Sequence, residues 1–158
     1  MTRTSDNSMK DLLQVVTFRL AGEEYALEIT KVKEVILPAG ITRVPQMPDC
    51  IVGIINLRGN VIPVVDLRTR FHLGERKADE QTRILIAKPS GRTVGFIVDA
   101  VSQVLKISRG DLQTPPETIA GIAQKYLRGI AKLGEERMIL LLDVEAILDP
   151  AELAALVA

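Results

Sequence analysis

The two halves of this chain of 158 residues repeat each other, and the repeat constrains the fold more than any other feature. The aligned pairs of the first stretch need no gap: Gly22 with Gly91, Leu27 with Phe96, Ile29 with Val98, Val32 with Val101 and Val35 with Val104. Further along, Gly53 aligns with Gly129 and Asp66 with Asp143. Each half is predicted to form a hairpin, a short turn, a strand, a loop and a second hairpin. Because a meander of short strands tends to close and remove its edges, the sequence predicts two small barrels that pack against each other.

The second hairpin of the first half is the best defined local element. Residues 51–57 and 61–65 are apolar and partly β-branched, and they flank the turn residues Arg58, Gly59 and Asn60. Pro63 cannot donate a ladder hydrogen bond, so it is expected at an edge or a bulge. Asp66 is expected to cap the turn that follows. Other predicted strands cover residues 14–20, 23–29, 35–37, 83–87, 93–98, 104–107, 126–133 and 138–142.

The segments outside these strands suggest the domain limits. Residues 1–11 are polar and are expected to be a disordered leader. Residues 12–158 are expected to form a single domain with approximate subdomains 14–72 and 82–148. A C-terminal helix over 149–158 is predicted from Asp149 as cap, Pro150 at the first helical position and Glu152 three residues after the cap. Thr30 and its repeat mate Asp99 are both expected to cap short helical turns.

Composition argues against several functional classes. Twenty basic and twenty acidic residues cancel, which disfavours a general nucleic-acid or membrane-surface binder. Aromatic residues are only 3% of the chain, too few for platforms that stack on single-stranded nucleic acid. No apolar run approaches the roughly 20 residues that span a bilayer, and the polar N-terminus does not resemble a signal peptide. The protein is therefore expected in the cytoplasm.

The residues that usually carry chemistry are scarce. His72 is the only histidine and Cys50 the only cysteine, so neither a disulfide nor a zinc site of three or four ligands is expected. His72 is interpreted as a surface residue and Cys50 as a small buried one. The segment Gly91 to Gly95 lacks the lysine of a phosphate-binding loop. The sequence therefore predicts no enzymatic activity, no cofactor and no metal.

Four motifs, in order, resemble the CheW family of bacterial chemotaxis adaptors. They are Val32-Lys33-Glu34-Val35, then Asn56-Leu57-Arg58-Gly59 with Pro63 and Asp66-Leu67-Arg68, then Val94-Gly95-Phe96-Ile97-Val98-Asp99, and finally Tyr126-Leu127-Arg128-Gly129. The resemblance covers about residues 15–148. It implies a mostly β fold of two SH3-like, five-stranded barrel subdomains with short helical turns. It also implies a non-enzymatic adaptor that joins the regulatory domain of the histidine kinase CheA to the cytoplasmic tip of methyl-accepting chemotaxis receptors.

The same resemblance assigns candidate contacts to two partners. Those implied on the receptor side are Glu34, Arg58, Gly95, Val101 and Val104. Those implied on the kinase side are Val32, Val44, Ile51 and Gly53. From the residues themselves, we expect Arg58 to pair with Glu34 beside a valine-lined groove that suits a partner helix. The alternatives are a CheW-like adaptor of another chemosensory array, such as one for twitching motility, a detached kinase regulatory domain, and a barrel that binds nucleic acid.

Overall fold

The computed structural model describes residues 11–74, 79–119, 122–148 and 151, and nearly all of its regular structure is β. The predicted leader, apart from residue 11, and nearly all of the predicted C-terminal helix therefore lie outside the described residues. The strands are β1 (Leu12–Leu20), β2 (Glu23–Glu28), β3 (Val32–Ile36), β4 (Ile51–Leu57), β5 (Asn60–Asp66), β6 (Arg83–Ala87), β7 (Val94–Val98), β8 (Ala100–Ser108), β9 (Leu112–Gln113), β10 (Thr118–Ile119), β11 (Ile122–Ala123), β12 (Leu127–Leu133) and β13 (Arg137–Leu142). The helical turns are η1 (Ile29–Lys31), α2 (Leu67–Arg70), η2 (Pro89–Gly91), η3 (Arg109–Asp111) and η4 (Gln124–Tyr126).

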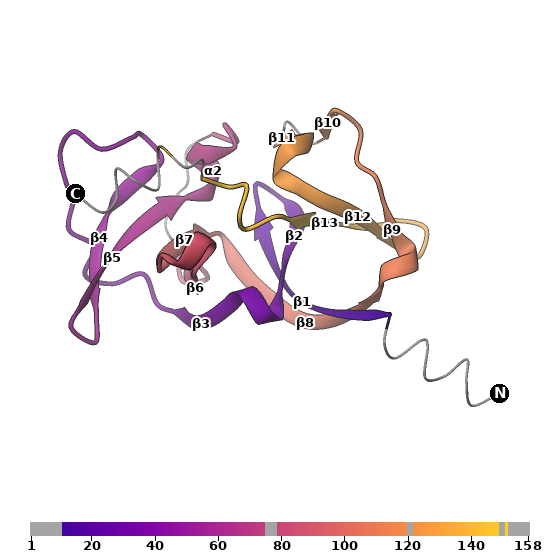
Figure 1. Ribbon diagram of the computed structural model, residues 1–158, viewed down its shortest axis with the longest axis horizontal. Coiled ribbons are helices and arrows are strands. Elements are labelled where there is room, and N and C mark those ends of the chain that lie inside the picture. Colours follow the sequence, from indigo (N-terminus) through magenta and orange to yellow (C-terminus); the bar gives the residue numbers. More distant parts are fainter. Residues whose placement is uncertain (1–10, 75–78, 120–121, 149–150, 152–158) are drawn as a thin grey trace.

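The strands form two principal sheets that lie side by side (Figure 1). One sheet has six strands in the order β8-β1-β2-β13-β12-β9, and the other has five in the order β3-β6-β7-β5-β4. The predicted mostly β fold with two packed subdomains is confirmed. The sixth strand of the larger sheet is the two-residue β9, which lies outside the strands predicted from the sequence.

The two halves of the chain exchange their first hairpins. The β1–β2 hairpin of the first half joins strands of the second half, through β1 with β8 and through the parallel pair of β2 with β13. In the same way, β6–β7 of the second half joins β3 and β5 of the first. The subdomains 14–72 and 82–148 thus describe the repeat in the sequence, whereas each sheet takes strands from both halves.

Ion pairs and one hydroxyl support the six-stranded sheet. Across β2 and β13, Nη2 of Arg137 lies 2.8 Å from Oε2 of Glu24, and Arg128 of β12 pairs with Glu28. The register of β1 and β8 shifts next to Thr17, whose hydroxyl donates to the Gln103 carbonyl and accepts from the Gln103 amide, both at 3.2 Å. The side chain thus bonds the backbone where the ladder is irregular.

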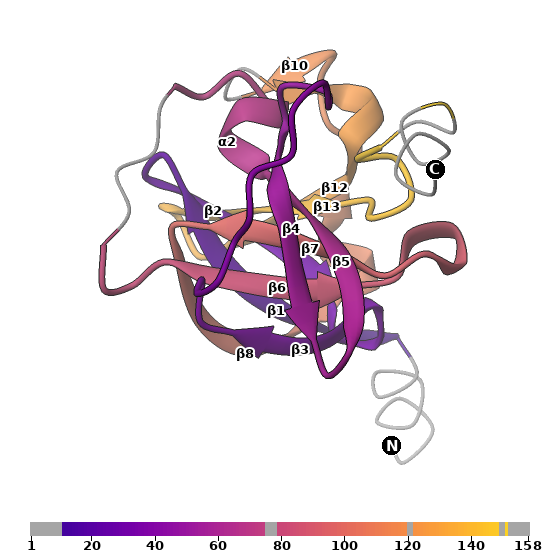
Figure 2. The same ribbon diagram turned by 90° about the vertical axis from the view of Figure 1, so that its left-hand side faces the viewer.

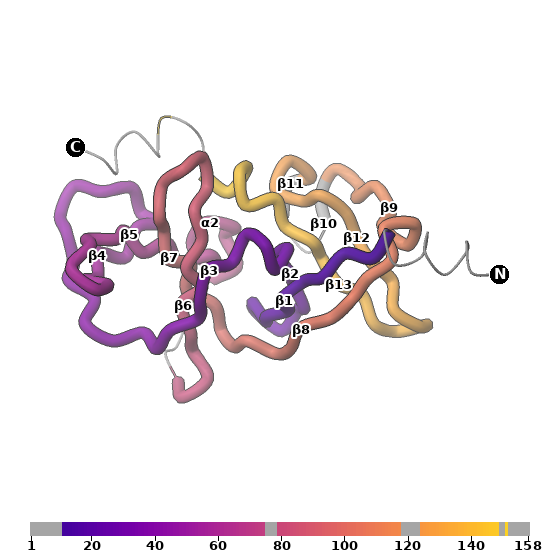
Figure 3. The backbone as a smooth tube through the Cα atoms, turned by 60° about the horizontal axis from the view of Figure 1, so that its bottom comes forward, coloured from indigo at the N-terminus to yellow at the C-terminus, as the bar shows by residue number. Residues whose placement is uncertain are grey.

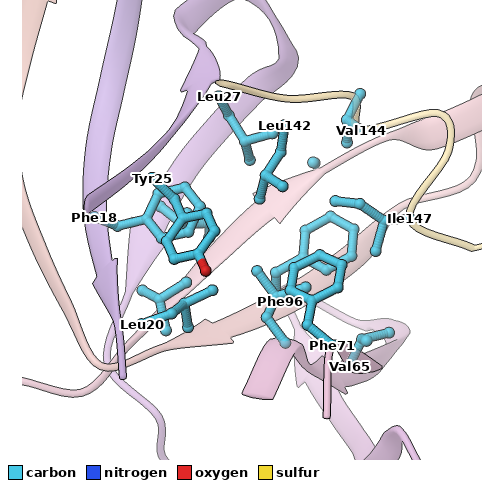
Figure 4. Packing of buried hydrophobic residues seen from close by; sticks show 14 of the residues in the cluster. Phe18, Leu20, Tyr25, Leu27, Val65, Phe71, Phe96, Leu142, Val144 and Ile147 are labelled. Carbon is cyan, nitrogen blue, oxygen red and sulfur yellow. The ribbon is translucent and has the colours of Figure 1, made fainter. Parts of the chain in front are cut away.

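The main hydrophobic core lies between the sheets and takes side chains from both (Figure 4). Phe18 and Tyr25 come from the six-stranded sheet and stack with ring centroids 6.1 Å apart. Phe96 and Val65 come from the five-stranded sheet, and all four are fully buried. Because this core is shared, each sheet depends on the other for part of its burial.

The turn after β5 is built as predicted and then ends in an unexpected way. Asp66 accepts from the backbone of Arg68 at 2.9 Å, which is the predicted cap. The short helix α2 ends with Leu73 donating to the Arg68 carbonyl and His72 to that of Thr69. This is a Schellman ending, but its left-handed position is occupied by His72, with φ 58°, where glycine is usual.

The caps predicted at Thr30 and Asp99 are wrong. Thr30 lies inside η1, and the residue before that turn, Glu28, makes no side-chain cap. Asp99 is followed directly by β8 and not by a helical turn. Its carboxylate instead accepts from the distant amide of Ala21. Both errors arise because a short polar residue after a strand can bond locally or to another part of the chain, and spacing alone does not decide between the two.

Candidate functional site

Two sheet edges on one side of the molecule carry exposed valines. β3 is an edge of the five-stranded sheet and β8 is an edge of the six-stranded sheet. Val35 of β3 is 41% exposed and Val104 of β8 is 49% exposed. Figure 3 brings this side forward and shows both strands on it. Free edges with exposed apolar side chains are places where proteins accept partners.

A groove of about 380 Å³ lies between these two strands. Its apolar wall consists of Val35 from β3 with Ala100 and Val101 from the start of β8. Its polar rim comes from Glu80 and Gln81, in the segment that leads into β6, and from Arg83, the first residue of β6. An apolar floor with a charged rim suits the apolar face of an amphipathic segment of a partner.

A second hollow, of about 500 Å³, lies beside β3 and includes Glu34 and Arg58. Nη1 of Arg58 donates to Oε2 of Glu34 at 2.7 Å, and Nη2 donates to Oε1 at 2.9 Å. The predicted pairing of these residues is therefore confirmed, and its geometry is bidentate. The hydrogen bond from Arg58 lowers the pKa of the Glu34 carboxyl.

The position of Arg58 follows from the hairpin turn. Arg58 and Gly59 both have positive φ, at 53° and 87°, as a two-residue turn of the mirror-image type requires. The Asn56 side chain accepts from the Gly59 amide at 2.8 Å and holds the turn. The Arg58 side chain remains 71% exposed, so its guanidinium is available to a partner while it pairs with Glu34.

The residues predicted on the receptor side do not form a single surface. Glu34 and its neighbour Val35 line different hollows, because successive side chains of a strand point to opposite faces. Val101 and Val104 lie on β8, near the groove of Val35. Gly95 is buried in β7, where an added Cβ would lie 2.7 Å from Cγ2 of Ile84. A substitution at Gly95 would thus disturb packing before it reached any partner.

The residues predicted on the kinase side lie around β3 and β4, at different depths. Val44 is half-buried in the irregular segment before β4, and Val32 is half-buried at the start of β3. Ile51 belongs to the shared core. Gly53 lets another segment cross closely, since an added Cβ would lie 2.2 Å from the Thr42 carbonyl oxygen. Thr42 and Ile54 exchange two backbone hydrogen bonds of 2.8 Å at this crossing.

The groove also contains residues that the sequence did not suggest as contacts. Val35 was absent from the contacts that the resemblance implies, but it belongs to the valines expected to line the groove, since the repeat aligns it with Val104. Glu80 lies between the two predicted subdomains, and Arg83 begins a predicted strand. The signal that could have identified them was the exposure of two edge strands, which depends on the order of strands in the sheets.

His72 and Cys50, the two residues most able to carry chemistry, lie beside one small hollow. His72 is exposed and Cys50 is buried, and both border a small hollow of about 210 Å³ with Asp49 and Arg70. Arg70 is already engaged there, since its Nε donates to the Ile147 carbonyl at 2.6 Å. Across the described ranges, no three His, Cys, Asp or Glu side chains are grouped as metal ligands. Within the same ranges, no helix has the length and apolar character needed to cross a bilayer.

Comparisons with known proteins agree on one family. The CheW-like domain family matches residues 14–152. Chemotaxis protein CheW of Klebsiella aerogenes is 38% identical over 141 residues, which cover 89% of this chain and 84% of that protein. Chemotaxis protein CheW of Helicobacter pylori is 35% identical over 147 residues, with 93% and 87% covered. The crystal structure of the scaffolding protein TtCheW from Thermoanaerobacter tengcongensis matches with a TM-score of 0.81 at 38% identity, over 89% of this chain and 90% of that one.

Proposed function

The chain belongs to the CheW family of chemotaxis proteins, and on that premise we propose that it couples the regulatory domain of a CheA-type histidine kinase to the cytoplasmic tip of methyl-accepting receptors. Members of this family are non-enzymatic scaffolding proteins. The proposal therefore concerns which partners bind and where, and it places the protein in the cytoplasm at receptor arrays.

The observation that carries the receptor half of the proposal is the groove between β3 and β8. Its wall of Val35 and Val101 is apolar, and Val104 lies further along the same strand. One apolar face of a partner helix would cover these valines. Glu34 of β3 and Arg58 of the β4–β5 turn pair beside the neighbouring hollow, where they offer charges to the same partner beyond the groove.

The kinase half of the proposal uses the surface around Val32 and Val44. Both are half-buried, so part of each side chain is accessible. Ile51 lies in the shared core and Gly53 lies against the Thr42 backbone, so these two residues would affect kinase binding through the fold and not by direct contact. In this arrangement the two partners occupy different surfaces of one rigid body. Two such weak sites raise the effective concentration of kinase near receptor.

The test is receptor-dependent kinase autophosphorylation with and without this protein. Val104→Lys places a charge on an exposed edge strand, so we expect the fold to survive and receptor binding to fall, while kinase binding remains. Met138→Lys is the matched control, because Met138 is 39% exposed and its strand is separated from β8 by β1 and β2. His72→Ala should leave kinase output unchanged.

Three results would contradict the proposal. Wild-type protein that fails to raise receptor-dependent kinase output would refute the coupling function. Equal loss of both partners in Val104→Lys, with an unchanged circular dichroism spectrum, would refute two separate surfaces. Binding of the protein to either partner alone is expected to have an affinity of about micromolar, on the order of −8 kcal/mol. Binding only to receptors of a different array, such as one for twitching motility, would favour the alternative adaptor.

A further inference from the structure

A charged cluster joins the two sheets next to the start of β8. Nε of Arg68 donates to Oδ1 of Asp99 at 2.9 Å, and Nη2 lies 2.5 Å from Oδ2. The Ala21 amide, in the β1–β2 turn, donates to Oδ2 of Asp99 at 2.9 Å. The side chains of Arg68 and Asp99 are only 22% and 19% exposed. We call these three residues the Asp99 clasp. It connects α2, which follows the five-stranded sheet, to a hairpin of the six-stranded sheet.

The repeat contains a counterpart on the other side of the molecule. Glu145 follows its capping residue Asp143 as Arg68 follows Asp66, and in each half the carboxylate of the capping residue accepts from the backbone two residues later. Glu145 accepts from the amide of Ser90 at 2.7 Å and from its hydroxyl at 3.0 Å. Ser90 lies in the β6–β7 turn, and its φ of 51° equals that of Ala21.

The Asp99 clasp and its counterpart, the Ser90–Glu145 tie, use different chemical groups. In the second half a carboxylate reaches the turn amide directly, because Glu145 is an acceptor. In the first half the equivalent residue is Arg68, whose side chain has no acceptor atom. Asp99 therefore bridges the guanidinium and the turn amide. This bridge fixes the position of Asp99, which immediately precedes Ala100 and Val101, the groove residues of β8.

The two ties also differ in their distance from the groove. In Figure 2 the β6–β7 turn, which carries Ser90, projects to the right, whereas the β1–β2 turn and the segment leading into β6 lie on the left. The Asp99 side chain accepts from the β1–β2 turn. Glu80 and Gln81 of the groove belong to the segment leading into β6, and Arg83 is the first residue of β6. The Asp99 clasp is therefore on the side of the groove, and the Ser90–Glu145 tie is not.

We propose that Arg68 and Asp99 are positioning residues for the groove between β3 and β8: by holding the start of β8 against the five-stranded sheet, they set where Ala100 and Val101 stand relative to Val35. This inference rests on the proposed receptor function of that groove. Asp99 is further fixed by its own amide, which donates to the Arg19 carbonyl at 3.0 Å. With both the side chain and the backbone held, β8 begins at one defined place.

The decisive variant is Asp99→Asn. The amide oxygen can still accept from Ala21, but a neutral amide cannot hold the partly buried guanidinium of Arg68 on two oxygens. The start of β8 then samples other positions, and only part of the population presents the groove in its binding form. If that fraction falls to about a tenth, the apparent affinity for a partner falls about tenfold. Asp99→Glu keeps the charge and both acceptor oxygens, so it should recover most of the affinity.

The experiment combines two measurements on the full chain. The first is binding of a soluble receptor cytoplasmic fragment that includes the hairpin tip. The second is amide hydrogen exchange over residues 100–104. We expect Asp99→Asn to bind about tenfold more weakly and to exchange faster over 100–104. Glu145→Gln is the matched control, because it weakens the equivalent tie away from the groove and should leave both measurements near wild type.

The outcomes separate this inference from the proposed function. Wild-type affinity and exchange in Asp99→Asn would overturn the positioning role. Equal losses in Asp99→Asn and Glu145→Gln would also overturn it, since the effect would then reflect general loosening of the two sheets. Failure of Asp99→Glu to recover binding would show that the charge is not what positions β8. If the wild type does not bind the receptor fragment, the proposed function fails. In that case, unchanged amide hydrogen exchange over residues 100–104 in Asp99→Asn would by itself refute the positioning role of the Asp99 clasp.

Discussion

Replacing Tyr25 by phenylalanine should stabilise the protein. Tyr25 is fully buried, and its hydroxyl, which points into the shared core (Figure 4), bonds no other group in the described part of the chain. Burial without a partner raises the pKa of this phenol, mainly through desolvation. Burying an uncompensated hydroxyl costs about 1–3 kcal/mol by mutational data, and this cost disappears in Tyr25→Phe. The ring and its stacking on Phe18 remain.

The assay is urea unfolding followed by circular dichroism, with a thermal scan as a second measure. The midpoint should rise at unchanged m-value, and Tm should rise by about 2–12 °C for a chain of this size. Tyr126→Phe is the control, because Tyr126 is only half-buried, and it should change little. A loss of 1 kcal/mol or more in Tyr25→Phe would refute the reasoning, because it would show that the hydroxyl has a partner in the native state.

Three further substitutions test local features. Gly53→Ala should lower the free energy of unfolding by about 1–3 kcal/mol in urea, because the added Cβ would displace Thr42 and strain two backbone hydrogen bonds. An unchanged stability would show that the segment around Thr42 can move away without loss. His72→Gly should raise stability by about 0.5–1 kcal/mol by relieving a left-handed residue, whereas His72→Ala should bring no such gain. Glu24 has a lowered pKa, chiefly through its hydrogen bond from Arg137. The Glu24 carboxylate thus adds to the free energy of unfolding above pH 4.5, and this contribution is lost as the pH falls through the lowered pKa. The stability advantage of wild type over Glu24→Gln should therefore shrink on acidification. An advantage that grew on acidification would contradict this account.

The hairpins were predictable because their signals are local. Ala21-Gly22 and Arg58-Gly59 are turn residues between alternating apolar runs, and both turns are where the sequence placed them. The exchange of hairpins was not predictable, because a repeat shows which segments are alike and not which copy each segment pairs with. That choice depends on the whole set of contacts in the shared core. The short strands β9, β10 and β11 were missed since two residues carry no periodicity.

The site was predicted in part for a similar reason. The pairing of Arg58 with Glu34 was expected because an isolated charge at an apolar hairpin tip needs a partner. The role of Asp99 was assigned incorrectly, since the same carboxylate could cap a local turn or accept from a distant one. The predicted valine groove required Val32 and Val35 to share a face. They do so although they are three residues apart, because a register shift between Val32 and Glu34 sets Val32 opposite Ala87 and Val35 opposite Leu85, two residues apart on β6.

The exchanged hairpins also determine when each sheet can form as the chain is synthesised. The β1–β2 hairpin emerges early, but the strands that flank it, β8 and β13, end only at residues 108 and 142. Until then its apolar face, including Phe18, has no sheet to join. The five-stranded sheet can be completed once residue 98 has emerged. Because distant partners must be found before such contacts stabilise the fold, we expect the five-stranded sheet to assemble first and then to act as the surface on which the early hairpin docks.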